Sequence, residues 1–435
     1  MRDGEARGRG ERRGFHAYWA LAALVAGLAL GSLAGTFDPA AREGALKAAG
    51  FVGTLWLNGL KMTVIPLVIT LLVTGIARSA EAAQGSRIAA RSVLWIVILC
   101  TVSAIVGALL TLLLTHLFPL APSTAAALQS GLSAVDQKAP QELPGIIDFF
   151  TGVVPSNVIA AGSNGDVLPL VVFGLLFALA LTRIGAAGRQ SVVTLFEAIA
   201  EALLVIIRWV LWIAPLGVFA LAFSVGSEAG AAAFAGLGHY VVLVSAVGLL
   251  WTFGAAYPFA IIGGRRSPGA FSKALIGPQA VAVSTRSSLA CLPAMLTAAR
   301  SLGVREQSAD VALPLAVALF RSTGPAMNVA VAFYVAHWLG LEPTIGQMIA
   351  AVAVGAVMSY GAVSLPGEVS FISSIAPIGI ALGIPIAPLG LLVAVEMIPD
   401  IFRTLGNVTF DVSLATVVDR ETGEESAAGD RPHAV

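Results

Sequence analysis

The stretch STRSSLACLP, residues 284–293, is a short polar interruption in a chain that is otherwise strongly hydrophobic. It carries four hydroxyl groups and the guanidinium of Arg286, and Pro293 ends it. A helix that faces lipid does not accommodate such a run, because unpaired polar groups are costly in hydrocarbon. The stretch therefore indicates broken backbone that lines a cavity walled by protein.

The overall composition agrees with a membrane environment. Hydrophobic residues make up 57% of the chain and charged residues only 11%, whereas soluble domains carry about 25% charged residues. The formal net charge of +0 argues against a nucleic-acid partner. Cys100 and Cys291 lie far apart in apolar surroundings, which favours inert thiols over a disulfide or a metal site. The composition predicts an all-α polytopic membrane protein.

The apolar runs predict the first six membrane spans. They cover residues 17–36, 47–79, 91–118, 146–185, 191–226 and 234–263. A more polar loop at 119–145 separates the third run from the fourth. Several runs exceed the ~20 residues that cross a bilayer, which tilted helices partly explain. Residues 1–16 and 420–435 are expected to form polar tails, the second of them unstructured.

Beyond residue 268 the apolar segments are interrupted rather than merely long. The interruptions lie at 284–293, 320–328 and 360–370, and each combines Gly or Pro with Ser or Thr. A break exposed to lipid would leave backbone groups unpaired at several kcal/mol each. Short half-helices around polar tips are typical of the substrate site of a secondary transporter.

Basic residues near the span ends predict the orientation. Arginines crowd the segment 1–16, and more basic residues lie in 78–91, 183–189 and 265–273. These segments alternate consistently, so the positive-inside rule places them in the cytoplasm. The sequence thus predicts a multi-pass protein of the inner or plasma membrane with both termini cytoplasmic.

Five motifs of this chain resemble those of the dicarboxylate/amino acid:cation symporter family, whose best-known members transport glutamate and aspartate. They occur in the order expected for that family. The motifs are LKMTVIPLVITLLVTG (60–75), VVPSNVIAAGSNGDVLPLVVFGLLFALAL (153–181), APLGVFAL (214–221), TRSSLACLPAM (285–295) and DIFRTLGNVTFD (400–411).

This resemblance implies a specific architecture. It consists of eight transmembrane helices and two re-entrant helical hairpins, near residues 268–301 and 345–384. The resemblance also implies a homotrimer, whose scaffold would come mostly from residues 17–226. Residues 227–419, joined by the third span, would form a transport domain that slides across the membrane.

The tip of the first hairpin is the first predicted contact with substrate. Helix N-termini carry partial positive charge and hold carboxylates. Ser287 and Ser288, with Arg286 beside them, are therefore expected to contact a substrate carboxylate. The alternative is that the hydroxyls only cap the half-helices, and the two roles are compatible.

The last apolar segment carries Glu396, Asp400, Arg403, Asn407 and Asp411. The spacings of the last four place them on one helix face. At ~3 kcal/mol for each charge, the face is too costly to point at lipid. An internal salt-bridge network that provides rigidity is the alternative to a binding site.

The resemblance assigns roles to this face. It implies that Asp400 takes a substrate ammonium and that Arg403 takes a side-chain carboxylate, a role that suits a planar guanidinium. Thr404 and Asn407 would complete the polar lining. Asn407 and Asp411 match family positions that hold a sodium ion.

The chain departs from the family in the seventh span. Where the family has Asn-Met-Asp-Gly-Thr, residues 320–324 read FRSTG. Ser322 replaces a sodium-ligating Asp, and Gly324 replaces the Thr that touches substrate. Arg321 brings a permanent positive charge, which could neutralise Asp411 as a bound cation would. A sodium ion 4 Å from it would cost about 4 kcal/mol at an effective dielectric near 20.

The second hairpin tip carries Glu368 where the family usually has small neutral residues. Arg321 could instead pair with it. Loss of sodium ligands and gain of a carboxyl group favour H+ over Na+ as the coupling ion. Glu368 and then Glu396 are the expected protonatable groups.

The sequence thus predicts a secondary active symporter for a small anion, either a C4-dicarboxylate or an acidic or polar amino acid. No cofactor is expected besides the coupling ion. An uncoupled exchanger or a channel on the same fold remains an alternative. An intramembrane serine hydrolase using Ser287 or Ser288 is another, but it requires a base within hydrogen-bond reach, and none of the three interruptions contains His.

Overall fold

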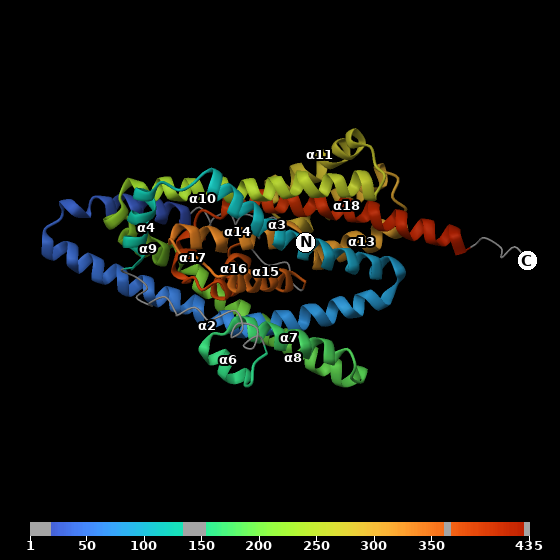
Figure 1. Ribbon diagram of the computed structural model, residues 1–435, viewed down its shortest axis with the longest axis horizontal. Helices are drawn as coiled ribbons and strands as arrows, with labels where there is room; N and C mark the ends of the chain where they lie inside the picture. Colours follow the sequence, from blue (N-terminus) through green and yellow to red (C-terminus); the bar gives the residue numbers. More distant parts are fainter. Residues whose placement is uncertain (1–18, 134–153, 361–366, 430–435) are drawn as a thin grey trace, which may run out of the picture.

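The computed structural model describes residues 19–133, 154–360 and 367–429, and every regular element within these ranges is helical (Figure 1). A helical segment, Trp19–Thr36, opens the described chain. The α-helices that follow are α2 (Pro39–Gly85), α3 (Arg87–Leu117), α4 (Pro122–Ser133), α6 (Val158–Asn164), α7 (Val167–Leu181), α8 (Ala186–Trp212), α9 (Ala214–Ala229), α10 (Ala231–Trp251), α11 (Pro268–Thr285), α12 (Ser288–Ser301), α13 (Glu306–Leu319), α14 (Thr323–Trp338), α15 (Ile345–Ser359), α16 (Gly367–Leu382), α17 (Ala387–Leu392) and α18 (Met397–Gly429).

Six helical segments in the described ranges are long and apolar enough to cross a membrane. They are Trp19–Thr36, Pro39–Gly85, Arg87–Leu117, Ala186–Trp212, Ala232–Gly263 and Glu306–Trp338. Two π-helical segments, η2 (Thr252–Ala256) and η3 (Phe259–Gly263), extend α10. The chain is a multi-pass membrane protein, as the sequence predicts.

Two details of the predicted spans need correction. The sequence predicts a loop at 119–145, yet this segment begins with α4. It also predicts one span over the apolar run 191–226, yet this run is divided into α8 and α9 at Ile213. Pro215 explains the division, because proline lacks the N–H that would continue the helix and is tolerated in a first turn.

The helices form two packing groups. In the first, α2 runs against α7, α8 and α9. The opening segment packs on α9 through Gly27 and Gly31. A Cβ on Gly31 would meet the carbonyl of Phe223, so the absence of a side chain allows the two backbones to touch.

The second group surrounds α18. It contacts α10, α11, α12 and α13, while α3 runs along α14 (Figure 1). At Gly107 of α3 a Cβ would collide with the backbone of Ala326 in α14. The third span therefore belongs with the C-terminal helices by packing. The pair α15 and α16 contacts α2, α7 and α8, and so joins the two groups.

The predicted interruptions coincide with breaks between helices. Helices α11 and α12 pack on one another and meet at Arg286, whose φ is 50°. Helices α13 and α14 are separated by residues 320–322. The third interruption falls between α15 and α16, and residues 361–366 lie outside the described ranges.

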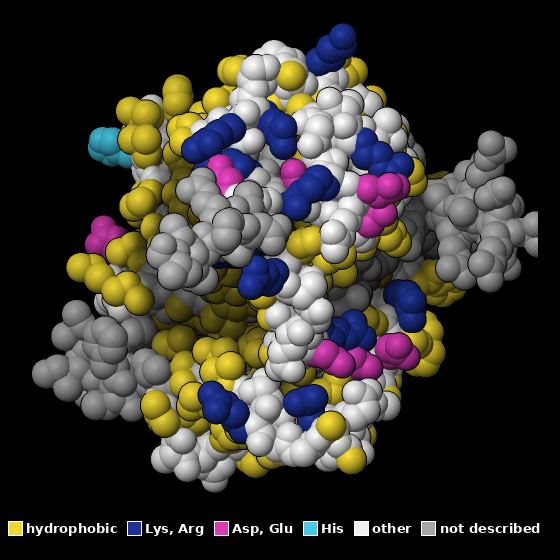
Figure 2. Space-filling view, turned by 90° about the vertical axis from the view of Figure 1, so that its right-hand side faces the viewer, with side chains coloured by type: hydrophobic (Ala, Val, Ile, Leu, Met, Phe, Trp, Pro, Cys, Tyr) yellow, Lys and Arg dark blue, Asp and Glu magenta, His cyan; other side chains and the backbone are white. Residues whose placement is uncertain are grey.

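The C-terminal end differs from the expected unstructured tail, because α18 continues to Gly429. Arg305 contacts the start of the extension, because its Nη2 donates to Thr422 Oγ1 at 3.0 Å. Arg265 pairs with Glu424 at 3.2 Å. Figure 2 shows this end of the molecule, where basic and acidic side chains lie side by side.

Candidate functional site

The charged face of α18 and the turn before it is buried inside the protein. Glu396 and Asp411 are 2% and 1% exposed. Asp400 and Arg403 are also buried. The prediction that these charges do not face lipid is confirmed, and the site is built where α18 meets the broken helices.

Arg403 is only half paired. Its Nη1 donates to Glu396 Oε1 and, at 3.3 Å, to Asp400 Oδ1. Its Nε and Nη2 are buried and have no hydrogen-bond partner among the described residues. These two atoms form one edge of the guanidinium, which is the geometry that binds a carboxylate through two parallel hydrogen bonds. The arginine thus combines an internal ion pair with an open binding edge.

Glu396 has a second partner in α10. The hydroxyl of Tyr240 donates to Glu396 Oε2 at 3.0 Å, and the tyrosine is fully buried. Both oxygens of this carboxylate are therefore engaged, one by Arg403 and the other by Tyr240. The ion pair between Arg403 and Glu396 also agrees in part with the alternative considered from the sequence, which was an internal salt-bridge network.

Side chains hold the break between α13 and α14. The carbonyl of Ser322 accepts hydrogen bonds from Ser103 Oγ and, at 3.1 Å, from Trp251 Nε1. The hydroxyl of Ser103 in turn accepts from the N–H of Ala326 at 3.1 Å. Asn407 Oδ1 accepts from the N–H of Thr323 at 3.0 Å. Polar backbone groups freed by the break are thus satisfied inside the protein, as a membrane environment demands.

Asp411 contrasts with these paired groups. Neither of its carboxylate oxygens has a hydrogen-bond partner among the described residues. Arg321, from the break, lies close enough to Asp411, Asp400 and Arg403 to interact with all three electrostatically. The predicted neighbourhood of Arg321 and Asp411 is therefore present.

The other predicted residues are placed as follows. Gly324 is buried in the first turn of α14, and the Thr404 hydroxyl bonds to the carbonyl of Asp400 at 2.9 Å. Ser287 caps α12 by accepting from the N–H of Ala290 at 3.4 Å. Among the described contacts, neither it nor Arg286 or Ser288 is hydrogen-bonded to α18. Glu368 falls in the first turn of α16, and its side chain lies outside what the structure describes.

Sequence reasoning missed four residues of this region, namely Ser103, Tyr240, Trp251 and Thr323. A detectable signal existed for two of them, because Tyr240 and Trp251 place polar atoms inside the apolar run 234–263. Ser103 gave no such signal, since isolated serines bond to their own helix in many apolar segments.

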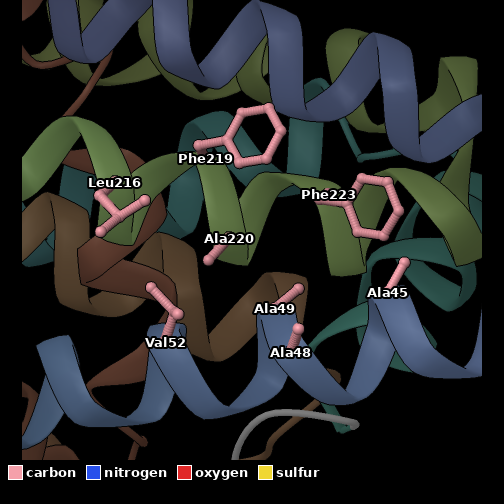
Figure 3. Close-up of a pocket in the computed structure, with 8 residues that line it drawn as sticks. All are labelled: Ala45, Ala48, Ala49, Val52, Leu216, Phe219, Ala220 and Phe223. Atoms are coloured by element: carbon pink, nitrogen blue, oxygen red, sulfur yellow. The ribbon is translucent and has the colours of Figure 1, made fainter.

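A groove elsewhere on the molecule is not suited to an anion. It lies between α2 and α9 and has a volume of about 240 Å³ (Figure 3). Only apolar side chains line it, from Ala45, Ala48, Ala49, Val52, Leu216, Phe219, Ala220 and Phe223. The charged face of α18 therefore remains the candidate site for an anionic ligand.

Broken helices that surround buried charges define a class, since such sites are the mark of secondary transporters. Comparison with known proteins agrees. Residues 17–421 match the Sodium:dicarboxylate symporter family. The chain belongs to that family, and its members are transporters rather than enzymes.

Several characterised relatives align over most of their length. The chain is 28% identical to the proton/glutamate-aspartate symporter of Escherichia coli K12, covering 92% of each protein. It is 27% identical to the proton/sodium-glutamate symport protein of Bacillus caldotenax, covering 86% of this chain and 87% of that protein. It is 23% identical to a C4-dicarboxylate transport protein of Rhizobium etli, covering 92% and 88% respectively.

Proposed function

We propose that this protein is a secondary active symporter that moves a small anionic substrate together with protons. The observation that carries the proposal is the half-paired Arg403, whose open edge lies beside two carboxylates in a buried site. The names of its relatives support glutamate, aspartate or a C4-dicarboxylate as the substrate class.

In this proposal the Nε and Nη2 edge of Arg403 binds one substrate carboxylate. Asp400 lies beside it and would attract the ammonium of an amino acid. Thr404, Asn407 and Gly324 would line the rest of the site. A second carboxylate would meet the tip between α11 and α12, where Arg286 supplies positive charge and Ser287 and Ser288 supply donors.

Glu396 provides a way to couple the substrate to a proton. When ionised it holds Arg403 and competes with the substrate carboxylate for the same positive charge. When protonated it no longer competes, because the negative charge is gone. Binding of a proton and of the anion would therefore favour one another, as symport requires.

Three features support protons rather than sodium as the coupling ion. The oxygen of Asn407 already accepts from Thr323, and the carbonyl of Ser322 already accepts from two donors. The guanidinium of Arg321 adds positive charge near Asp411, where the family holds a cation. Sodium at Asn407 and Asp411 would face the occupied Asn407 oxygen and the positive charge of Arg321. Glu368, which the sequence places first as the proton-binding group, is here the alternative to Glu396, because its side chain lies outside what the structure describes.

We extend the proposal to the architecture. The group around α2 would form the scaffold of a homotrimer, and the group around α18 would form the moving transport domain. The pairs α11–α12 and α15–α16 would be re-entrant hairpins, which gives eight spans in all. The packing of α3 on α14 supports its place in the transport domain. Both termini would lie in the cytoplasm, at the end where α18 finishes, and transport would follow an elevator motion.

Uptake into proteoliposomes tests the function. The purified protein is offered labelled L-aspartate or labelled succinate, either with an inward proton gradient and no Na+ or with an inward Na+ gradient at constant pH. We expect accumulation with the proton gradient alone. Strict dependence on Na+ would refute proton coupling. Exchange that ignores both gradients would indicate an uncoupled exchanger, and ion current without substrate would indicate a channel.

A further inference from the structure

The ionisable side chains of α10 and α14 form an unusual pattern. These two apolar helices carry only four such side chains, which are His239 and Tyr240 in α10 and Tyr334 and His337 in α14. His239 contacts the carbonyl of Phe118, just after the end of α3, and His337 lies in the last turn of α14. The start of α10 lies at the end of the molecule opposite to the C-terminal end of α18 (Figure 1). Membrane packing alone does not require ionisable groups there, and such groups usually mark ion or proton pathways.

The four side chains form a series from the surface to the site. His337 is exposed and His239 is half-buried, whereas Tyr334 and Tyr240 are almost fully buried. His337 lies close enough to His239 to interact with it electrostatically. Tyr334 and Tyr240 are in edge-to-face contact, with ring centroids 5.5 Å apart. Tyr240 then donates to Glu396, the carboxylate that pairs with Arg403.

The surroundings of His239 suit a group that gains and loses a proton. Its Nε2 lies 2.9 Å from the carbonyl oxygen of Phe118, and its Nδ1 lies 2.9 Å from the hydroxyl of Tyr334. A carbonyl only accepts, so Nε2 carries the hydrogen of the neutral ring. Nδ1 is then bare and accepts from Tyr334.

Protonation of His239 leaves no group unsatisfied. The new N–H at Nδ1 donates to the oxygen of Tyr334. The hydrogen of that hydroxyl then turns to the carbonyl of Gly236, which lies 3.2 Å away. Both ring nitrogens and the Tyr334 hydroxyl are therefore hydrogen-bonded in either charge state of the ring, which is the arrangement that a proton carrier needs.

We propose that His337, His239, Tyr334 and Tyr240 form the route by which protons pass between the outer aqueous phase and Glu396. This inference rests on the proposed proton symport and on the orientation that places the start of α10 at the outer face. It goes beyond them by naming the entry path and the residues that form it.

The transfer steps balance as follows. His239 takes a proton at Nδ1 from the water at the outer end and passes it to the hydroxyl oxygen of Tyr334. As Tyr334 takes this proton, its own O–H turns from the Gly236 carbonyl and releases its hydrogen to a water molecule, which the proposal requires between the Tyr334 and Tyr240 hydroxyl groups, and that water passes a proton to Tyr240. Tyr240 releases its own O–H proton to Glu396 Oε2 while its oxygen takes the incoming one, so each tyrosine ends neutral.

The charged and titratable groups around Glu396 fit this direction of transfer. Arg403 and Asp400 act on it from α18, and Tyr240 acts on it from α10. Of these partners only Tyr240 leads toward the outer end of the molecule. Arg403 does not release protons at neutral pH, so it does not serve as the donor.

The test separates net proton movement from substrate movement. Variants are reconstituted, and labelled L-aspartate or succinate uptake is measured in two modes, with an inward proton gradient and as exchange at equal pH on both sides. A pH dye inside the vesicles records proton entry. The route variants are His239→Gln, His337→Gln, Tyr334→Phe and Tyr240→Phe. The controls are His116→Gln, at the end of α3, and Tyr257→Phe, which contacts Phe253 and Phe271.

We expect His239→Gln to lower gradient-driven uptake and proton entry on the order of 100-fold while exchange stays at the wild-type rate. Tyr334→Phe should act in the same way, and the controls should match the wild type in both modes. Normal gradient-driven uptake in His239→Gln and Tyr334→Phe would overturn the route but leave proton symport intact. Equal loss of both modes would also overturn it, by showing a structural role. A wild type that ignores the proton gradient would overturn the proposed function itself.

Discussion

Two aspartates eight residues apart on α18 are treated in opposite ways. Asp419 accepts from the side chain of Arg305 at 2.7 Å and from its backbone N–H at 3.3 Å, and Arg266 lies 3.8 Å away. Asp411 is buried even more deeply, yet neither of its oxygens has a partner among the described residues. The same helix thus carries one satisfied carboxylate and one that is left open.

The difference shows what each end of α18 contributes. A buried carboxylate without a partner is costly, and Asp419 shows that this fold can supply arginines where a carboxylate serves the structure. The open oxygens of Asp411 and the open edge of Arg403 therefore support the proposal that the first half of α18 binds the substrate. The C-terminal end of α18 is held to the rest of the protein by the ion pairs of Asp419 with Arg305 and Arg266.

The sharpest way to break this comparison is to remove Arg403. Arg403→Ala should abolish uptake and weaken substrate binding by about 2–5 kcal/mol, because the substrate carboxylate loses its partner and Glu396 is left buried and unpaired. Arg403→Lys should also bind poorly, since an ammonium cannot form two parallel hydrogen bonds. Equilibrium binding of labelled dicarboxylate to the purified variants measures the effect. Unchanged dicarboxylate affinity in Arg403→Ala would rule out the role.

The two aspartates give a paired experiment of intermediate size. Asp419→Asn should destabilise the protein by about 1–2 kcal/mol, a value reduced because Arg305 is about half exposed to solvent. Its transport should persist. Asp411→Asn should change the stability less than Asp419→Asn does, because it removes a buried carboxylate that has no hydrogen bond but also removes a negative charge that acts on the buried Arg321, and it should abolish uptake.

Thermal unfolding in detergent measures the stability of the two aspartate variants, and uptake into proteoliposomes measures their transport. Each aspartate variant is the control for the other, because both substitutions remove one negative charge from the same helix. If Asp411→Asn and Asp419→Asn lose the same amount of stability, Asp411 has a stabilising hydrogen-bond partner and is a structural residue, which contradicts the comparison.

The smallest expected effect concerns two indole donors. Trp251 donates to Ser322 at the break, and Trp95 donates to Glu421 near the C-terminal end at 3.1 Å. Replacement of either by Phe should cost about 1 kcal/mol of stability through the lost indole donor, which in Trp251 is shared between the carbonyl and the hydroxyl of Ser322. Only Trp251→Phe should also lower substrate affinity, because it loosens the break that carries Arg321. If Trp95→Phe lowers the substrate affinity as much as Trp251→Phe does, the C-terminal end of α18 also influences the binding region, and the comparison fails.

Much of this architecture could be predicted from the sequence, for physical reasons. In lipid every backbone N–H and C=O must be hydrogen-bonded within the protein. Polar interruptions in apolar runs therefore predict the breaks at Arg286 and at 320–322. Burial of Glu396 and Asp411 followed from the cost of charge in hydrocarbon.

The partners of those charges could not be predicted, because they come from distant parts of the chain. Ser103 and Trp251 meet Ser322 only after α3, α10 and the break have packed together. Tyr240 lies 156 residues from Glu396. The sequence does not predict the extension of α18, because the residues after Asp419 are polar, and their partners, such as Arg305 for Thr422, come from distant parts of the chain.

The left-handed backbone at Arg286 has a consequence for engineering. A side chain at a φ of 50° is strained relative to glycine. Arg286→Gly would relieve that strain and would be enriched in any selection for heat resistance. The same change would remove the guanidinium from the joint between α11 and α12. If Arg286 contacts the substrate as proposed, selection for stability alone would favour variants that transport less well, so a library at this position should be screened for uptake as well as for stability.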